Sequence, residues 1–130
     1  HPYQVYVPAS YDPARTWPVV LFLHGAGERG DDGLIQTEVG IGPAIRRHPE
    51  RFPALVVMPQ APRDTFWAGP PGEAALAALD RTCEEFSVDR RRQYLTGLSM
   101  GGHGSWLMGY HHPERFAAMR CARDARRRSH

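Results

Sequence analysis

Three short, mostly apolar runs constrain the fold of this chain more than any other feature of its sequence. Residues 19–23 (VVLFL), 55–58 (LVVM) and 94–98 (YLTGL) lack the polar alternation of a half-exposed strand. Such runs are typical of strands that helices cover on both faces, as in parallel sheets. Residues 3–8 (YQVYVP) alternate and end at a proline, which predicts a strand at the margin of the sheet. The sequence therefore predicts a buried, parallel-type sheet.

Helical segments are predicted between these runs. Residues 73–86 carry apolar side chains three or four positions apart, which is the spacing of one helix face. The stripe that we expect to face the sheet consists of Leu76, Leu79, Cys83 and Phe86. Shorter helices are predicted at residues 43–48 and 100–110. Alternation of strands and helices predicts an α/β fold with right-handed crossovers and helices on both faces of the sheet.

Length and composition fit one globular domain. The chain has 130 residues, 42% hydrophobic and 23% charged, and no apolar run approaches the ~20 residues of a membrane helix. We expect residues 1–119 to form the core and residues 120–130 (RCARDARRRSH) to form an arginine-rich tail, because the tail shows no helix or strand periodicity. The lack of a membrane-length apolar run predicts a soluble protein, and the sequence shows no signal-peptide pattern that would decide between a cytoplasmic and a secreted location.

The charge distribution bounds the partners of the chain. The net charge is +2, and six arginines lie between Arg115 and the end. A solvated tail explains this cluster without a nucleic-acid motif, so we expect no nucleic-acid or membrane partner. Cys83 and Cys121 are too few and too scattered for a disulfide framework or a metal cluster. No metal or organic cofactor is therefore expected.

Residues 97–101 (GLSMG) match the pattern G-x-S-x-G at the point where a predicted buried strand turns into a helix. Such a turn is tight, because side chains at the two glycine positions would collide with the neighbouring strand and helix. It lifts the hydroxyl of Ser99 to the carboxyl edge of the sheet and places the amide of Met100, at a helix N-terminus, beside developing negative charge. The alternative is a glycine-rich turn with an incidental serine.

A second glycine-rich segment, residues 24–30 (HGAGERG), directly follows the first buried strand. With little side-chain bulk, its backbone can approach a substrate oxygen closely. A phosphate-binding loop is the competing interpretation. The GK[ST] ending of a P-loop and the G-x-G-x-x-G of a dinucleotide site are both absent from this segment, which disfavours it.

Residues 3–118 resemble the α/β-hydrolase superfamily, within it the esterase, feruloyl-esterase-like and predicted-peptidase (prolyl oligopeptidase-like) group. The resemblance rests on VYVPASYDP, WPVVLFLHGAGERGDD, VVMPQ and YLTGLSMGGHGSW, and it implies a minimal or truncated α/β-hydrolase fold. It also implies Ser99 as nucleophile and the backbone amides of Ala26 and Met100, with Gly25 beside them, as the oxyanion site. Trp67 is then a wall of the acyl or alcohol pocket.

The general base is not evident from this resemblance. Family members follow the nucleophile with an acid and then a histidine, but only 31 residues follow Ser99 here. His103, four residues past Ser99, is our candidate for a local base, although the resemblance of its GHG sequence to the esterase D group implies packing. The other histidines considered are His24, His111, His112 and His130. The acids considered are Asp64 and Asp89.

Two functions follow for this chain. The first is hydrolysis of short-chain or aryl carboxylic esters through an acyl-enzyme at Ser99. The second is a catalytically impaired hydrolase fragment that serves as a binding or assembly module. Peptidase activity is a weaker third, because amide cleavage needs a proton donor for the leaving amine. We also expect a homo-oligomer, since residues 94–98 would form an exposed apolar edge strand.

Overall fold

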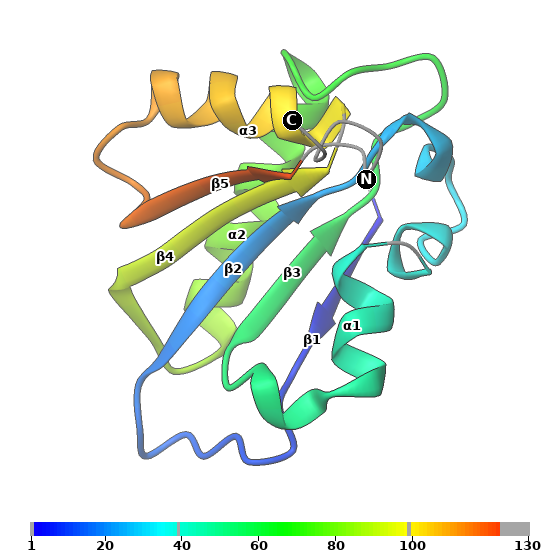
Figure 1. Ribbon diagram of the computed structural model, residues 1–130. Helices are drawn as coiled ribbons and strands as arrows, with labels where there is room; N and C mark the ends of the chain where they lie inside the picture. The colour runs from blue at the N-terminus through cyan, green and yellow to red at the C-terminus, as the bar shows by residue number, and fades with distance from the viewer. Residues whose placement is uncertain (1, 39, 99, 123–130) are drawn as a thin grey trace, which may run out of the picture.

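The computed structural model describes residues 2–38, 40–98 and 100–122, with side chains as far as Met119. Its centre is a mixed five-stranded sheet in the order β1-β3-β2-β4-β5 (Figure 1). The strands are β1 (Tyr3–Tyr6), β2 (Trp17–Leu23), β3 (Leu55–Pro59), β4 (Val88–Leu98) and β5 (Ala118–Ala122). Strands β3, β2, β4 and β5 run parallel, and β1 pairs antiparallel with β3 at the margin, as predicted.

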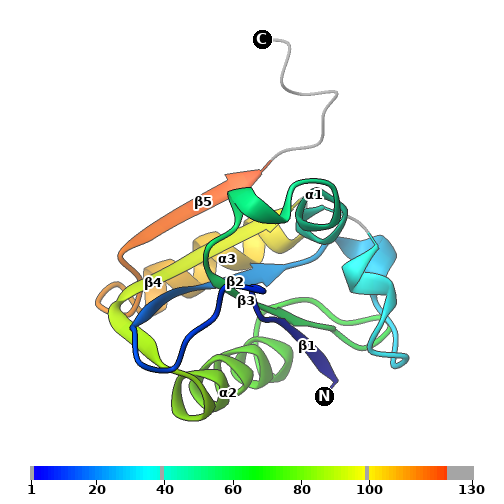
Figure 2. The ribbon, with the colours of Figure 1, turned by 90° about the horizontal axis from the view of Figure 1, so that it is seen from below.

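Helices cover both faces of this sheet, which confirms the predicted α/β architecture. They are α1 (Ile41–Arg47), α2 (Pro70–Glu85) and α3 (Met100–His111), together with the short 3₁₀ segments η1 (Ala26–Glu28), η2 (Ile35–Thr37) and η3 (Pro49–Arg51). In Figure 2, α1 lies on one side of the strands and α2 on the other. Among the described helices, none combines the length and the apolar character that crossing a membrane requires.

Side chains of β2 divide between two cores. Leu21 and Leu23 are fully buried in the larger core, which α2 and α3 close. Phe22 points the other way and packs with Ile45 of α1 in the smaller core. Complete burial of one such leucine contributes about 2 kcal/mol. The run at residues 19–23 is continuous because both faces of the strand are covered.

Helix α2 presents the predicted apolar stripe to the sheet. Leu79 is fully buried and Cys83 nearly so, while Leu76 and Phe86 are half-buried and pack on the same core. The helix begins at Pro70, three residues earlier than predicted, because proline is suited to the first helical turn.

Strand β4 is longer than predicted, since it begins at Val88 instead of Tyr94. Its first half carries Asp89 and three exposed or half-exposed arginines, whose charge obscures the strand pattern in the sequence. The pairing of β4 with β2 also shifts register between Trp17 and Val19. Trp17 pairs with Val88 and Val19 with Gln93, so the charged residues 89–92 lie in the irregular part of this pairing.

The expectation that residues 94–98 form the edge of the sheet is wrong. Strand β5 pairs with β4 in parallel, with Tyr94 opposite Ala118 and Leu98 opposite Ala122. The strand therefore continues three residues beyond Met119, where we placed the end of the core. A five-residue strand held by backbone pairing shows too little side-chain periodicity to be recognised in the sequence.

Candidate active site

The strand-to-helix turn at the end of β4, residues 97–101, is called the elbow below and has the predicted tightness. Strand β4 ends at Leu98 and α3 begins at Met100, whereas Ser99 lies outside the described residues. A Cβ atom added at Gly97 would overlap the carbonyl oxygen of Gly101, and one added at Gly101 would overlap that of Leu23. Both positions of the motif thus require glycine because backbone atoms occupy the space of a side chain.

The amide of Met100 lies at the first position of α3. The first N–H groups of a helix have no acceptor within the helix, and the N-terminal end carries partial positive charge. This amide is therefore suited to stabilising an oxyanion, which is the role predicted for it.

The segment of residues 24–33 is called the glycine-rich loop below. It follows β2, the strand that pairs with β4 in the sheet (Figure 1). Ala26 opens η1 and is exposed. The amide of Gly25, in contrast, donates to Oε1 of Glu28 at 3.2 Å. Burial raises the pKa of the Glu28 carboxyl, and the hydrogen bond from Gly25 partly opposes this shift. The Gly25 amide thus supports the turn, whereas Ala26 is exposed and its carbonyl oxygen accepts a hydrogen bond from Nε of Arg29 at 3.0 Å.

His24 is fully buried and braces this loop. Its Nε2 accepts a hydrogen bond from the amide of Ala61 at 2.9 Å. The proton must therefore reside on Nδ1, which donates to the carbonyl oxygen of Gly25 at 2.6 Å. Burial lowers the pKa of His24, and the nearby charge of Arg29 lowers it further against the Gly25 hydrogen bond. With its lone pair committed, His24 does not serve as a general base.

Trp67 is wedged between the glycine-rich loop and α3. Its Nε1 donates to the carbonyl oxygen of His24 at 2.9 Å, and only 4% of its surface is exposed. A Cβ atom at Gly104 would collide with its side chain. The same tryptophan, with Leu76 and Met108, lines a cavity of about 220 Å³ between α2 and α3. The role of Trp67 as a wall of the acyl or alcohol pocket stays a prediction.

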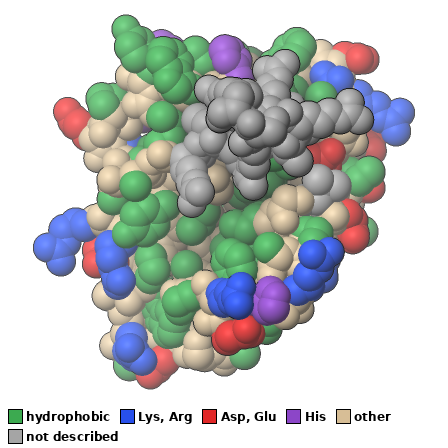
Figure 3. Space-filling view, in the orientation of Figure 1, with side chains coloured by type: hydrophobic (Ala, Val, Ile, Leu, Met, Phe, Trp, Pro, Cys, Tyr) green, Lys and Arg blue, Asp and Glu red, His purple; other side chains and the backbone are tan. Residues whose placement is uncertain are grey.

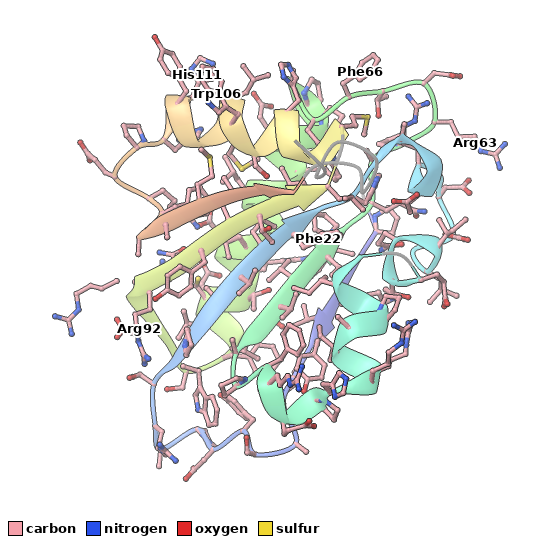
Figure 4. The ribbon with its side chains drawn as sticks, in the orientation of Figure 1. Phe22, Arg63, Phe66, Arg92, Trp106 and His111 are labelled. Atoms are coloured by element: carbon pink, nitrogen blue, oxygen red, sulfur yellow. The ribbon has the colours of Figure 1, made fainter. Side chains whose placement is uncertain are left out.

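His103 lies on the outer face of α3, exposed to solvent. Trp106 and Tyr110 follow it at helical spacing, exposed by 56% and 70%, with parallel rings whose centroids are 6.0 Å apart. Figure 3 shows hydrophobic side chains gathered where Figure 1 places α3, and Figure 4 labels Trp106 and His111 there. His103 is one turn from the predicted nucleophile and remains an untested candidate. His111 and His112 are also exposed, at the far end of α3.

The two candidate acids lie in different places. Asp89 is at the amino end of β4, the end opposite Ser99, and accepts a hydrogen bond from Nε of Arg92 at 3.0 Å. Its role there is structural. Asp64 lies on the exposed loop between β3 and α2, with a positive φ of 60° that aspartate tolerates in turns. Arg63 and Phe66 of the same loop extend toward solvent (Figure 4).

Sequence reasoning gave no role to two buried glutamines beside the glycine-rich loop. Gln60 is 1% exposed and Gln36 is fully buried. The amide of Gln60 makes three hydrogen bonds to this loop, whereas that of Gln36 donates to the carbonyl oxygen of Gly33 at the end of the loop and to that of Met58. The available signal was the position of Gln60, a polar residue directly after a buried strand. Within the described part of the chain, no cluster of His, Cys, Asp or Glu side chains is suited to a metal ion.

A mostly parallel sheet, a strand that turns through a glycine-flanked serine position into a helix, and a glycine-rich loop on the adjacent strand define the α/β-hydrolase fold. Within this class, the chain belongs to the Esterase family (Putative esterase), whose model matches residues 2–122.

Solved structures agree with this assignment. A thermostable esterase is 35% identical, with a TM-score of 0.80 over 90% of this chain. A ferulic acid esterase, 23% identical with a TM-score of 0.68, and the fluorophosphonate-binding serine hydrolase F of Staphylococcus aureus, 19% identical with 0.67, each match 90% of this chain and share its fold. The chain spans 35%, 51% and 48% of their respective lengths. No curated protein matches significantly.

Proposed function

We propose that this chain carries the nucleophile and the oxyanion site of a carboxylic-ester hydrolase that acts on short-chain or aryl esters. The observation that carries the proposal is the contact of the first turn of α3 with the start of the glycine-rich loop. At Gly101, a side chain is excluded by the backbone carbonyls of Leu23 and His24. This contact brings the helix that begins at Met100 against the loop that contains Ala26.

In the proposed reaction, the hydroxyl oxygen of Ser99 attacks the acyl carbon while a general base takes its proton. The amides of Ala26 and Met100 stabilise the tetrahedral oxyanion. The proton passes to the leaving alkoxide as the ester C–O bond breaks, and water then hydrolyses the acyl-enzyme. Membership in the Esterase family supports the ester as substrate, and the names of a ferulic acid esterase and a serine hydrolase among structures of the same fold support an aryl acyl group and a serine nucleophile.

One set of contacts favours the second candidate function, an impaired hydrolase that binds without turnover. The lone pair of His24 is committed to Ala61, and Asp89 lies at the wrong end of β4. Neither His24 nor Asp89 can therefore contribute to a histidine–acid pair beside the predicted nucleophile. An oxyanion site without its base retains roughly 10³ to 10⁴ of rate enhancement over water, so activated esters are the appropriate substrates.

The test is hydrolysis of p-nitrophenyl acetate and butyrate by the parent chain, Ser99→Ala and His103→Ala. His48→Ala, exposed directly after α1 and outside the candidate site, is the matched control. We expect Ser99→Ala to abolish turnover, His103→Ala to lower it by about 10²-fold or more if His103 is the base, and the control to leave it unchanged. Equal rates for the parent and Ser99→Ala would overturn the esterase proposal in favour of the binding module.

We also propose that the chain self-associates, with β5 as the sheet edge in place of β4. An edge strand presents unpaired backbone groups that seek a partner. Light scattering at micromolar concentration tests this proposal, and a monodisperse monomer would contradict it.

A further inference from the structure

The side chain of Gln60 makes all its described hydrogen bonds to the glycine-rich loop. Its Oε1 accepts from the amide of Gly33 at 2.7 Å. Its Nε2 donates to the carbonyl oxygen of Glu28 and to Oδ1 of Asp32, each at 3.0 Å. A primary amide has two N–H donors, so both donors of this buried group are used on one loop.

These bonds hold the loop at two places, the carbonyl group of Glu28 and the turn formed by Asp32 and Gly33. Glu28 closes η1, the turn that Ala26 opens. Oδ1 of Asp32 also accepts hydrogen bonds from the amides of Leu34 and Ile35 at 3.0 and 3.2 Å. These hydrogen bonds help to hold the pKa of Asp32 below the ordinary value. Gln60 thus joins the end of η1 to the turn that follows it.

The backbone next to Gln60 extends this support. The carbonyl oxygen of Ala61 accepts from the amide of Gly30 at 3.0 Å, and the amide of Ala61 donates to His24 at 2.9 Å. A Cβ atom at Gly30 would lie only 3.2 Å from Nε2 of Gln60. The loop therefore packs closely against this dipeptide at the end of β3.

Apolar packing does not fix the loop. From Gly25 to Gly33, the buried residues are three glycines and Glu28, none of which buries an apolar side chain, and Ala26 is exposed. Hydrogen bonds to buried partners must then determine its conformation, and the Gln60 side chain makes three of them.

We propose that Gln60 is a positioning residue that sets the oxyanion amide of Ala26 through η1. The proposal rests on the proposed function, since it assigns that amide to the transition state. An oxyanion donor must lie 2.7–3.1 Å from the charged oxygen, and a shift of ~1 Å costs about 10²-fold in rate. The hydrogen bond from the Ala26 amide to the substrate oxygen strengthens in the transition state. Loss of the Gln60 amide therefore lowers kcat more than it changes KM.

The matched pair for the test is Gln60→Met and Gln36→Met. Both glutamines are buried, and both changes replace an amide with an apolar side chain of similar length. Gln36 donates to the carbonyl oxygens of Gly33 and Met58, each at 3.1 Å, and to nothing between residues 24 and 32. Gln60→Glu is a second variant that retains the volume and the acceptor for Gly33 while losing the two donors.

Two readouts are measured on the full chain. The first is kcat and KM for p-nitrophenyl acetate, where Gln60→Met is expected to lower kcat by about 10- to 100-fold, with KM changed less than about threefold. The second is amide hydrogen exchange by NMR, which requires no turnover. We expect exchange at Gly30 to be at least about tenfold faster in Gln60→Met and Gln60→Glu, and unchanged in Gln36→Met.

The two readouts separate the proposals. A parent chain without esterase activity, combined with faster Gly30 exchange in the Gln60 variants, overturns the proposed function and supports the positioning of the loop by Gln60. Unchanged exchange at Gly30 in a folded Gln60 variant overturns the role of Gln60, whatever the activity. Equal losses of kcat in Gln60→Met and Gln36→Met also overturn it, since they indicate a general effect of burying fewer amides.

Discussion

The indole nitrogen of Trp67 donates to the carbonyl oxygen of His24 at 2.9 Å, and the two rings meet edge to face with centroids 4.8 Å apart. Trp67 precedes α2, and His24 follows β2. Because Gly104 of α3 also packs on this tryptophan, one side chain on the loop before α2 contacts both the glycine-rich loop and α3. The position of Trp67 is thus decided by the loop and the helix together.

This relationship predicts the cost of losing the indole N–H. Trp67→Phe removes the N–H together with the five-membered ring of the indole. It leaves the buried carbonyl oxygen of His24 without its donor and opens space in the core, which we expect to lower the free energy of unfolding by about 2–5 kcal/mol. Urea denaturation measures the change. Trp106→Phe is the control, since Trp106 is 56% exposed and its replacement should stay within about 0.5 kcal/mol. Equal effects of the two variants would contradict the structural role of the Trp67 hydrogen bond.

The glycines of the elbow give a second prediction. Gly101→Ala forces a methyl group onto the carbonyl of Leu23, which should cost about 3 kcal/mol or more and displace the start of α3. Gly27→Ala is the matched control in the same site, because no heavy atom outside its chain neighbours lies within 4 Å of the added methyl. Thermal unfolding compares the two variants. If Gly101→Ala unfolds at the temperature of the parent, the elbow is looser than the geometry requires.

The lowered pKa of His24 predicts how stability depends on pH. The folded state holds this imidazole neutral, and its pKa lies below the ordinary value of 6.5. The unfolded chain therefore binds the extra proton first. The contribution of His24 is complete above pH 6.5 and is lost as the pH falls from 6.5 through the folded pKa. Urea midpoints measured between pH 5 and about 8 should decline on the acidic side.

Two variants assign that decline to His24. His24→Asn should remove it, whereas His103→Asn, at an exposed position, should retain it. Glu28 acts in the opposite direction, because burial raises its pKa above 4.5. Its contribution to the free energy of unfolding decreases as the pH rises from 4.5 through the folded pKa. Glu28→Gln separates the two effects. A decline that persists unchanged in His24→Asn would show that another group causes it.

The parts of the site that the sequence predicts are those where the backbone constrains side-chain size. The run 19–23 indicates burial on both faces, and GLSMG indicates a turn too tight for side chains, so β2 and the elbow are found correctly. Gln60 and the tautomer of His24 depend on contacts between segments about 30 or more residues apart. No local pattern contains such contacts.

The end of the core shows the same limit, and it yields a last prediction. Strand β5 is defined by pairing with β4 from Tyr94 to Leu98, not by its own side chains. A chain of residues 1–117 lacks β5, leaves β4 as an apolar edge, and should lose several of the ~5–15 kcal/mol that stabilise a domain while forming larger assemblies. A chain of residues 1–122 keeps β5 and removes only the last eight residues of the predicted arginine-rich tail. Its urea midpoint should equal that of the parent. Light scattering and urea denaturation of both chains distinguish the boundaries, because equal behaviour of the two would place the end of the core before Ala118.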